Sequence, residues 1–467
     1  MGAPGAKSEI FCAVPKGLFY YDRMTGFRPQ VYQPLKWIPS LYVAEGFPYA
    51  LVAFVALLVY RNLGLSIGDT AEYASWLTLP WVLKPLWGPV VELIGTRRSW
   101  IWVMEVCEAL ALAAIALSIS SPHFLPLTMI FFLLLGFCSA THDMAADGFY
   151  LLALAEHYQA FFSGVRNTFY RVAMIGAQGG LVILVAKWFR QDANYVEAWR
   201  RGFFLSALLL FSFSVYHYFV LPRPAGDVKG IIAPSIDENG SQRKISAARA
   251  RESVFAGFFE SFVSFFKKPN IVPMLAFLLL YRLGEAQLVK IAPLFLIADR
   301  SHGGLGMAQE QLGWIYGTIG VIALLAGGLA GGFLASQNGL KAWLWPMLFA
   351  IHLPDAVFIW LAHAQPQNLL LIQAGIVVEQ FGYGFGFSAF MLYMIYIARG
   401  SHQTSHYALC TGFMALGMML PGMVSGRLQE FFGYEHFFLW VILATIPSFV
   451  VAAIIPLDRE FGKRKAG

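Results

Sequence analysis

Long apolar runs recur along the whole of this chain, and they limit the folds that it can adopt. Runs such as Leu125 to Gly136 and Phe203 to Val215 lie within longer apolar segments, and a membrane-spanning helix needs about 20 such residues. In lipid only α-helices and closed β-barrels satisfy every backbone hydrogen bond. Barrel strands are alternating segments of ~10 residues, shorter than these runs. The pattern predicts an all-α integral membrane protein.

The composition agrees with a bilayer environment. Charged residues make up 13% of the chain and hydrophobic residues 58%, with a mean hydropathy of +0.60, whereas a soluble domain has about a quarter charged residues. A soluble all-helical protein is the alternative, and the number of apolar runs disfavours it. The net charge of +6 does not indicate nucleic-acid binding, because the basic residues lie mostly between apolar segments rather than in one patch.

The cysteines predict neither a metal centre nor a disulfide framework. They are scattered, without the spacing of metal ligands, and most lie in apolar runs where they act as small buried residues. We therefore expect no cofactor and no metal. The four are Cys12, Cys107, Cys138 and Cys410.

Twelve spans are expected, six on each side of a polar linker. No cleavable signal peptide is apparent. We expect a cytoplasmic arm at 1–35, a first half at 36–221, a linker at 222–269, a second half at 270–456 and a tail at 457–467. Within the linker, residues 252–266 predict an amphipathic helix at the membrane surface, with an early start of span seven as the alternative. The spans are expected at 36–60, 71–94, 100–119, 125–150, 161–186, 202–221, 270–297, 308–335, 340–362, 367–398, 403–426 and 436–456.

The distribution of Lys and Arg predicts the orientation. With the N-terminus inside, the inner segments carry 21 of these residues and the outer segments seven. Basic residues are retained on the cytoplasmic side of membrane proteins. We therefore expect a multi-pass protein with both termini and the linker in the cytoplasm.

Charged residues occur inside only some of the spans. Each costs roughly 2.5–3.5 kcal/mol at the centre of a membrane helix unless it has a partner or a function. In transporters of the major facilitator type, two halves of six spans enclose a midplane site, and spans 1, 4, 7 and 10 line it. Spans 6, 9 and 12 have little interior charge apart from Asp355. The four cavity spans carry Glu45, Asp143, Asp147, Arg282, Glu285 and Glu379.

Spans four and five predict an acid–base cluster. Asp143 and Asp147 are four residues apart and share one helix face, and Arg166 follows after a short loop. The alternative to a functional role is structural charge neutralisation. A lipid phosphotransferase also uses paired Asp on membrane helices, but it would need a D-G-x-x-A-R element that this chain lacks. His142 is expected to form a hydrogen bond in the cavity rather than to bind a metal, and no enzyme activity is expected.

The loop between spans two and three resembles the major facilitator loop signature. It reads Gly88-Pro89-x-x-Glu92-x-x-Gly95-x-Arg97-Arg98. Glu92, Arg97 and Arg98 are therefore expected to form an inner latch that opens in each transport cycle.

Four motifs, in order, resemble the AmpG-type muropeptide permeases and the neighbouring acetyl-CoA transporters. The motifs match this branch over most of residues 40–440. His142 replaces the usual Gln, Glu92 stands where Asp is common, and the arm and linker are long. The motifs are Ser139-Ala140-Thr141-His142-Asp143-Met144-Ala145-Ala146-Asp147, Tyr281-Arg282-Leu283-Gly284-Glu285-Ala286, Glu379 with Gly382, Gly384, Gly386 and Ser388-Ala389-Phe390, and Ser405-His406-Tyr407-Ala408-Leu409.

This resemblance implies proton-driven import of anhydromuropeptides, GlcNAc-anhydroMurNAc with or without peptide, across the bacterial inner membrane by a monomer. Acetyl-CoA-like or siderophore cargo belongs to neighbouring members, and a non-transporting receptor or scaffold is the alternative of another class. The resemblance points to Asp143, Asp147, Arg282, Glu285 and Glu379 as functional, and Glu45 completes the expected proton-coupling set. For an anionic sugar–peptide substrate we expect contacts from Arg282, Lys290, Arg166, Arg171, His142, Tyr281, Tyr49, Tyr170, Tyr383 and Gln380.

Glu285 is the expected proton carrier, with Glu379 as the second candidate. Glu285 lies three residues after Arg282, so the two can pair across one helical turn. If a substrate carboxylate binds Arg282, Glu285 loses its cation and is expected to take up a proton. The alternative is that the two residues only neutralise each other.

Overall fold

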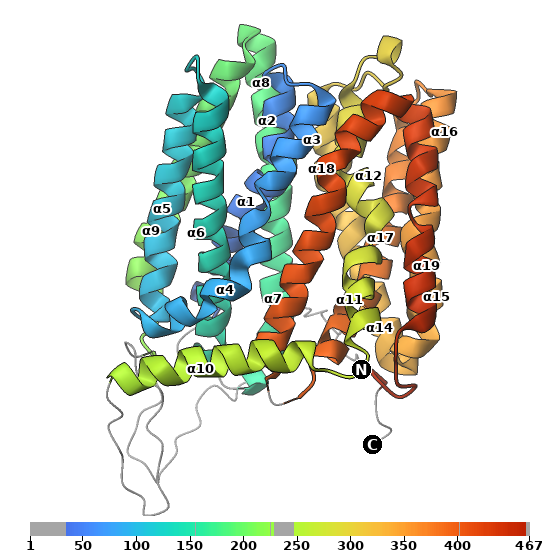
Figure 1. Ribbon diagram of the computed structural model, residues 1–467. Coiled ribbons are helices and arrows are strands. Elements are labelled where there is room, and N and C mark those ends of the chain that lie inside the picture. Colours follow the sequence, from blue (N-terminus) through green and yellow to red (C-terminus); the bar gives the residue numbers. More distant parts are fainter. Residues whose placement is uncertain (1–33, 155, 225, 228–246, 401, 464–467) are drawn as a thin grey trace, which may run out of the picture.

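The computed structural model describes residues 34–154, 156–224, 226–227, 247–400 and 402–463, in which helices are joined by turns and loops and no strand occurs. Most helices run along one common direction, and one helix lies across the end of the bundle (Figure 1). Residues 1–33 of the predicted arm and residues 225 and 228–246 of the predicted linker lie outside the described residues.

The first half contains six spans, several of them built from more than one helical segment. Span one is η1–α1–η2–α2, span two is α3–α4, and span five is α7–η3–α8. The segments are η1 (Pro34–Lys36), α1 (Ile38–Ala50), η2 (Leu51–Val55), α2 (Ala56–Asn62), α3 (Ile67–Trp76), α4 (Leu79–Leu93), α5 (Arg97–Ser118), α6 (Phe124–Ala153), α7 (Glu156–Met174), η3 (Ile175–Leu181), α8 (Val182–Asp192) and α9 (Tyr195–Val220).

The second half repeats this organisation after the crossing helix α10. Span seven is α11–α12, span eight is α13–η5–α14, and span nine is α15–η6–α16. The segments are α10 (Ala247–Phe266), α11 (Ile271–Leu280), α12 (Leu283–Ile297), η4 (Arg300–His302), α13 (Gln309–Trp314), η5 (Ile315–Gly320), α14 (Val321–Asn338), α15 (Leu340–His352), η6 (Leu353–Asp355), α16 (Ala356–Ala364), α17 (Leu369–Ala398), α18 (Gln403–Leu443) and α19 (Ile446–Ile454).

The predicted number of twelve spans is confirmed within the described residues. Ten helical stretches are long and apolar enough to cross a membrane. One of them, 403–454, turns back at Gly433, whose φ of 72° lies in the left-handed region that favours glycine, so it counts as two. The broken helix α3–α4 crosses the bundle as the twelfth (Figure 1).

Some predicted boundaries were wrong. Spans five and six are longer than expected, at 156–192 and 195–220, so Arg190, Arg200 and Arg201 lie on helices rather than in an outer loop. Span three begins at Arg97 because Thr96 caps it, its side chain accepting from the backbone N–H of Ser99.

Two helix breaks matter for the interior. The chain is interrupted between α11 and α12, where Arg282 has φ −114° and ψ 24°. It is interrupted again at η6, where Pro354 precedes Asp355 and cannot donate an intrahelical hydrogen bond. Transporters place binding sites at such discontinuous helices.

Polar contacts join the two halves at the end of the bundle opposite α10. Arg427 pairs with Glu72 at 2.6 Å, and Glu430 Oε1 accepts from the backbone N–H of Gly68 at 2.8 Å. Asn62 donates to Gln309 at 2.8 Å. In the same region the backbones of η3 and η5 approach so closely that a Cβ on Gly317 would collide with the Gln178 carbonyl. This end of the molecule is therefore closed.

Helix α10 is separate from span seven. A turn through Asn270, with φ 60°, divides it from α11, and the helix lies across the bundle end (Figure 1). Phe265 is fully buried and packs on Phe413 of α18, whereas Phe259 and Val263 are exposed. An apolar face that is left uncovered is typical of a helix at a membrane surface.

Candidate functional site

The first polar cluster in the interior joins α1 to α6. Glu45, Asp143 and Asp147 each place a carboxylate oxygen within 4.8 Å of the others. We call these three residues the N-half acid cluster.

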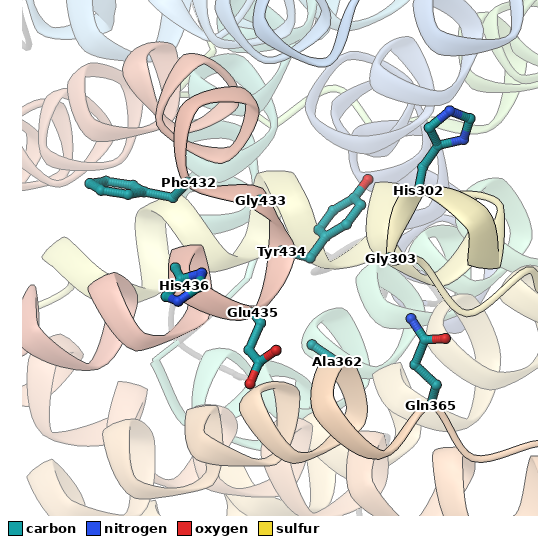
Figure 2. A pocket seen from close by; sticks show the side chains of 9 residues that line it. All are labelled: His302, Gly303, Ala362, Gln365, Phe432, Gly433, Tyr434, Glu435 and His436. Atoms are coloured by element: carbon teal, nitrogen blue, oxygen red, sulfur yellow. The ribbon is translucent and has the colours of Figure 1, made fainter.

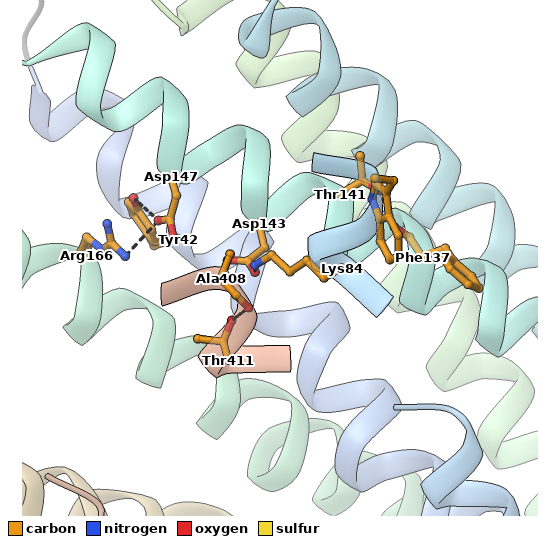
Figure 3. A network of polar contacts seen from close by, with 10 residues as sticks. Tyr42, Lys84, Phe137, Thr141, Asp143, Asp147, Arg166, Ala408 and Thr411 are labelled. Atoms are coloured by element: carbon orange, nitrogen blue, oxygen red, sulfur yellow. Dashed lines mark hydrogen bonds and ion pairs between the residues drawn. The ribbon is translucent and has the colours of Figure 1, made fainter. Parts of the chain in front are cut away.

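Two cations neutralise most of this cluster. Lys84 on α4 forms an ion pair with Asp143, and Arg166 on α7 pairs with Asp147 at 2.9 Å (Figure 3). The Arg166 guanidinium also lies over the Tyr42 ring, 4.9 Å from its centroid, and Tyr42 donates to Asp147 at 3.4 Å. The expected Asp–Arg cluster on spans four and five is therefore present.

Glu45 is the member without a cation. It is 6% exposed and its Oε2 has no hydrogen-bond partner. Three acids face two bases here, so full ionisation would leave one negative charge in the interior, which is costly. The pair of Asp147 and Arg166 is 43% and 32% exposed, so water reaches this part of the bundle.

The second polar cluster lies in the other half. Glu285 on α12, Asp355 at η6 and Glu379 on α17 again place carboxylate oxygens within 4.8 Å of one another. All three are at most 2% exposed. Among the described residues no Lys or Arg forms an ion pair with them. We call them the C-half acid cluster.

The predicted pair of Arg282 and Glu285 is not formed. Because the helix is interrupted at Arg282, this side chain does not lie one helical turn from Glu285. Its guanidinium donates to the Tyr383 hydroxyl and lies over the Phe387 ring, 4.8 Å from the centroid. Glu285 joins Asp355 and Glu379 instead.

Arg282 lies near a second arginine from the opposite half. Tyr49 on α1 and Tyr383 on α17 both interact electrostatically with Arg171 and with Arg282. The described residues include no ion-pair partner for either arginine, and each has a buried Nε without a hydrogen-bond partner. Tyr49 also packs on Trp81 and Tyr170, at 5.1 and 6.2 Å between centroids. We call Arg171, Arg282, Tyr49 and Tyr383 the arginine–tyrosine site.

Three predicted substrate contacts lie elsewhere. His142 faces α5 rather than the space that Asp143 faces, with Glu105 and Glu108 at 3.5 Å. Tyr281 is fully buried in the core and donates to the Gly386 carbonyl at 3.1 Å. Lys290 donates to the Ala74 carbonyl at 3.2 Å, at the junction of the two halves.

Gln380 supports the C-half acid cluster rather than lying with the arginines. Its Nε2 donates to Glu379 Oε2 at 3.0 Å. The amide therefore orients one of the three acids.

Residues of the predicted latch are tied to the beginning of the linker. The backbone N–H groups of Arg97 and Arg98 donate to the Asp227 carboxylate at 2.7 and 3.0 Å. The Arg98 side chain donates to the Leu221 carbonyl at 3.1 Å. The side chain of Glu92 lies outside the described residues, so the latch stays a prediction.

Several interior polar residues were not among the predicted site residues. Lys84 in span two has no predicted role, and Asp355 is only the exception among the peripheral spans. The signal for Asp355 is Pro354 beside it in an apolar run. Glu105 and Glu108 in span three and His217 in span six were missed, although an i, i+3 acid pair inside an apolar run is itself a signal.

Two hollows lie at opposite ends of the bundle. One of about 270 Å³ lies beside the Gly433 turn, at the end opposite α10, and is lined by residues that include His302, Gln365 and Glu435 (Figure 2). Another of about 350 Å³ lies at the α10 end beside Gln403 and Tyr407. Tyr407 interacts electrostatically with Asp147 and Arg166, so this second hollow leads towards the N-half acid cluster.

Either acid cluster has the ligand type that hard cations prefer. The N-half cluster already has Lys84 and Arg166 as counter-charges, which disfavours a metal ion there. The C-half cluster lacks such a cation within the described residues, so protons or a cation must balance its charge.

Comparison with known proteins identifies relatives over most of the chain. A model of the BT1 family matches residues 43–222. A putative transporter AmpG 4 from Rickettsia conorii is 25% identical over 420 residues, covering 88% of this chain and 93% of that protein. The anhydromuropeptide permease of Escherichia coli K12 is 24% identical over 428 residues, covering 90% and 79%. The resemblance to AmpG-type permeases is confirmed.

Solved structures confirm the major facilitator fold. The nucleoside transporter NupG aligns with a TM-score of 0.64 at 14% identity, covering 91% of this chain and 99% of that one. The D-xylose–proton symporter aligns with a TM-score of 0.62 at 12% identity, covering 92% and 98%. These relatives and solved structures are named as transporters, permeases or symporters, and this chain shares the fold of the solved structures.

Proposed function

We propose that the chain is a proton-coupled importer of anhydromuropeptides, that is, of an anionic amino sugar with or without a peptide. The single observation that carries this proposal is the arginine–tyrosine site. Arg171 and Arg282 come from opposite halves, and the described residues supply no ion-pair partner for either. A guanidinium binds carboxylate as a bidentate fork, and aromatic faces beside it suit the apolar face of a sugar ring.

The location of the site supports alternating access. Its members lie on α1, α7, α17 and the α11–α12 break, so both halves contribute. With the end opposite α10 closed by contacts such as Arg427 to Glu72, the site opens towards α10. Rocking the halves about such a site is the general mechanism of transporters built from repeats.

The C-half acid cluster supports proton coupling. Among the described residues these three buried carboxylates have no Lys or Arg as an ion-pair partner, and the one basic contact is His352, 3.9 Å from Asp355, so they cannot all be ionised in a low-dielectric interior. Glu285 interacts electrostatically with Arg282, Asp355 and Glu379. A substrate carboxylate that binds Arg282 offsets the positive charge that Arg282 exerts on Glu285, and so favours protonation of Glu285. Substrate and proton then bind cooperatively, with Glu379 as the second carrier and Glu45 as the corresponding residue of the first half.

The names of the relatives support the substrate. Two proteins that align with most of this chain are named as a putative AmpG transporter and an anhydromuropeptide permease. The same relationship supports a location in a bacterial inner membrane. We propose that it acts as a monomer with two six-span halves at 36–221 and 270–456, and with α10, the linker and both termini in the cytoplasm.

Counterflow of labelled anhydromuropeptide in proteoliposomes, without a pH gradient, tests the substrate. Unlabelled muropeptide inside should drive the exchange, whereas the corresponding sugar without its carboxylates should not. Acetyl-CoA and a ferric siderophore are the competing cargoes. Exchange driven by either of them but not by muropeptide would reassign the substrate, and exchange with none would favour a receptor.

A further inference from the structure

A line of buried titratable groups runs through the first half, apart from both acid clusters. Glu105 and Glu108 on α5, His142 on α6 and His217 on α9 are fully buried. We call these four residues the His–Glu file. We propose that it binds two protons and exchanges them with the solution at the α10 end.

The distances define an ordered path. Glu108 Oε1 lies 3.5 Å from His142 Nδ1, and His142 Nε2 lies 3.5 Å from Glu105 Oε1. The same Glu105 oxygen lies 2.6 Å from His217 Nδ1. His217 Nε2 lies 2.9 Å from the Ser40 hydroxyl on α1. Each step joins a group that can hold a proton to one that can accept it.

The path descends from the middle of the bundle to its α10 end. Glu108 and Glu105 lie about 16 and 12 Å along α5 from its first residue at ~1.5 Å per residue. His217 lies near the end of α9 and Ser40 near the start of α1, both at the α10 end. Ser40 is partly exposed. The file is therefore buried at mid-membrane and meets solvent through one hydroxyl.

Charge balance requires protons in the file. With both carboxylates ionised and both imidazoles neutral, the file would carry two negative charges, and each buried unpaired ion costs several kcal/mol. Two bound protons make it neutral. Glu105 Oε2, both Glu108 oxygens and both His142 nitrogens have no hydrogen-bond partner, so the groups are not satisfied by fixed donors and acceptors around them.

The surroundings do not supply the missing charge. On α6 the adjacent Asp143 is paired with Lys84 from α4. Cys107 and Cys138 are the titratable neighbours of Glu108, and α1 contributes Ser40. The described residues include no Lys or Arg in an ion pair with the file. Its ligand atoms follow a line rather than converging on one point, which suits a proton relay better than a metal ion.

Ser40 acts as the gate of the relay. Its hydroxyl donates to the Trp37 carbonyl at 3.1 Å, and a hydroxyl has a single proton to donate. In that arrangement Ser40 accepts from His217 Nε2–H, while His217 Nδ1–H donates to Glu105. Rotation of the Ser40 hydroxyl towards His217 lets Ser40 donate its proton to His217 Nε2 instead. The two arrangements differ by one proton on His217, and solvent at Ser40 supplies or removes it.

Infrared spectroscopy of the full chain in lipid, during transfer from H₂O to D₂O, tests the file without any substrate. Glu105→Gln and Glu108→Gln should each remove an exchangeable carboxyl or imidazole signal. His363→Gln is the matched control, because His363 forms an exposed pair with Glu435 at 2.9 Å at the opposite end. It should leave those signals unchanged. Spectra of both glutamine variants that equal the wild type would overturn the proposal.

A second variant tests the exit and remains informative if the glutamine variants do not fold. Ser40→Ala should slow exchange of the same signals by roughly tenfold, the effect of losing one relay hydrogen bond, and Ser40→Thr should restore the wild-type rate. Exchange at the wild-type rate in Ser40→Ala would refute the exit at Ser40. Because no transport is measured, these results are independent of the proposed substrate.

Discussion

Arg282 has its positive charge among aromatic rings and a phenol rather than beside an acid. Arg282→Gln should raise the KM for muropeptide exchange roughly 10- to 100-fold, since a hydrogen bond to a charged group contributes about 1.5–3 kcal/mol. Arg282→Lys keeps the charge but loses the bidentate fork of the guanidinium, so its KM should lie between those of the wild type and Arg282→Gln. Arg200→Gln, on an exposed pair with Glu197 at 2.8 Å, is the control. An unchanged KM in Arg282→Gln would remove this residue from substrate binding.

Lys84 and Asp143, unlike Arg282, are interior charges that neutralise each other in an ion pair. Their side chains are 19% and 22% exposed. Lys84→Met should lower the unfolding free energy by about 3 kcal/mol, because it leaves a largely buried carboxylate unpaired. The double variant Lys84→Met/Asp143→Asn should recover most of that loss. Thermal unfolding in detergent measures both, and a double variant no more stable than Lys84→Met would argue against the pair.

At the scale of elements, the approach of η3 and η5 sets how the end opposite α10 closes. A Cβ on Gly317 would collide with the Gln178 carbonyl, whereas a Cβ on Gly332 of α14 meets nothing within 4 Å. Gly317→Ala should therefore hold this end open at a cost of about 1–3 kcal/mol to the closed state, and reduce transport. Accessibility of the site to reagents from that side should rise. Gly332→Ala should behave as the wild type, and equal transport by both would contradict this role.

The sequence predicts the number of spans because apolar length is a property of each segment alone. It also predicts the pairing of Asp147 with Arg166, since both lie near one short loop. The sequence fails to predict contacts where a break in a helix decides the direction in which a side chain points. The interruption at Arg282 separates that residue from Glu285, and Pro354 turns Asp355 inward. Glu105 meets His217 across 112 residues, a contact that no local pattern encodes.

At the scale of the whole molecule, the orientation in the membrane is the first requirement for import. The positive-inside rule places α10 in the cytoplasm. In a cysteine-free background, Glu260→Cys on α10, 75% exposed, should resist a membrane-impermeant thiol reagent added to intact cells. His363→Cys at the other end, also 75% exposed, should react. The reverse pattern would invert the topology and turn the proposed importer into an exporter.

In the proposed mechanism a carboxyl group in the second half couples proton entry to substrate entry. Uptake of labelled anhydromuropeptide into proteoliposomes, with the substrate side made acidic, tests it most directly. The wild type should accumulate substrate above the external concentration and lose this accumulation with a protonophore. Glu285→Gln should exchange substrate but not accumulate it, because an amide cannot release a proton. Accumulation by Glu285→Gln equal to that of the wild type, or wild-type uptake indifferent to the gradient, would contradict the account.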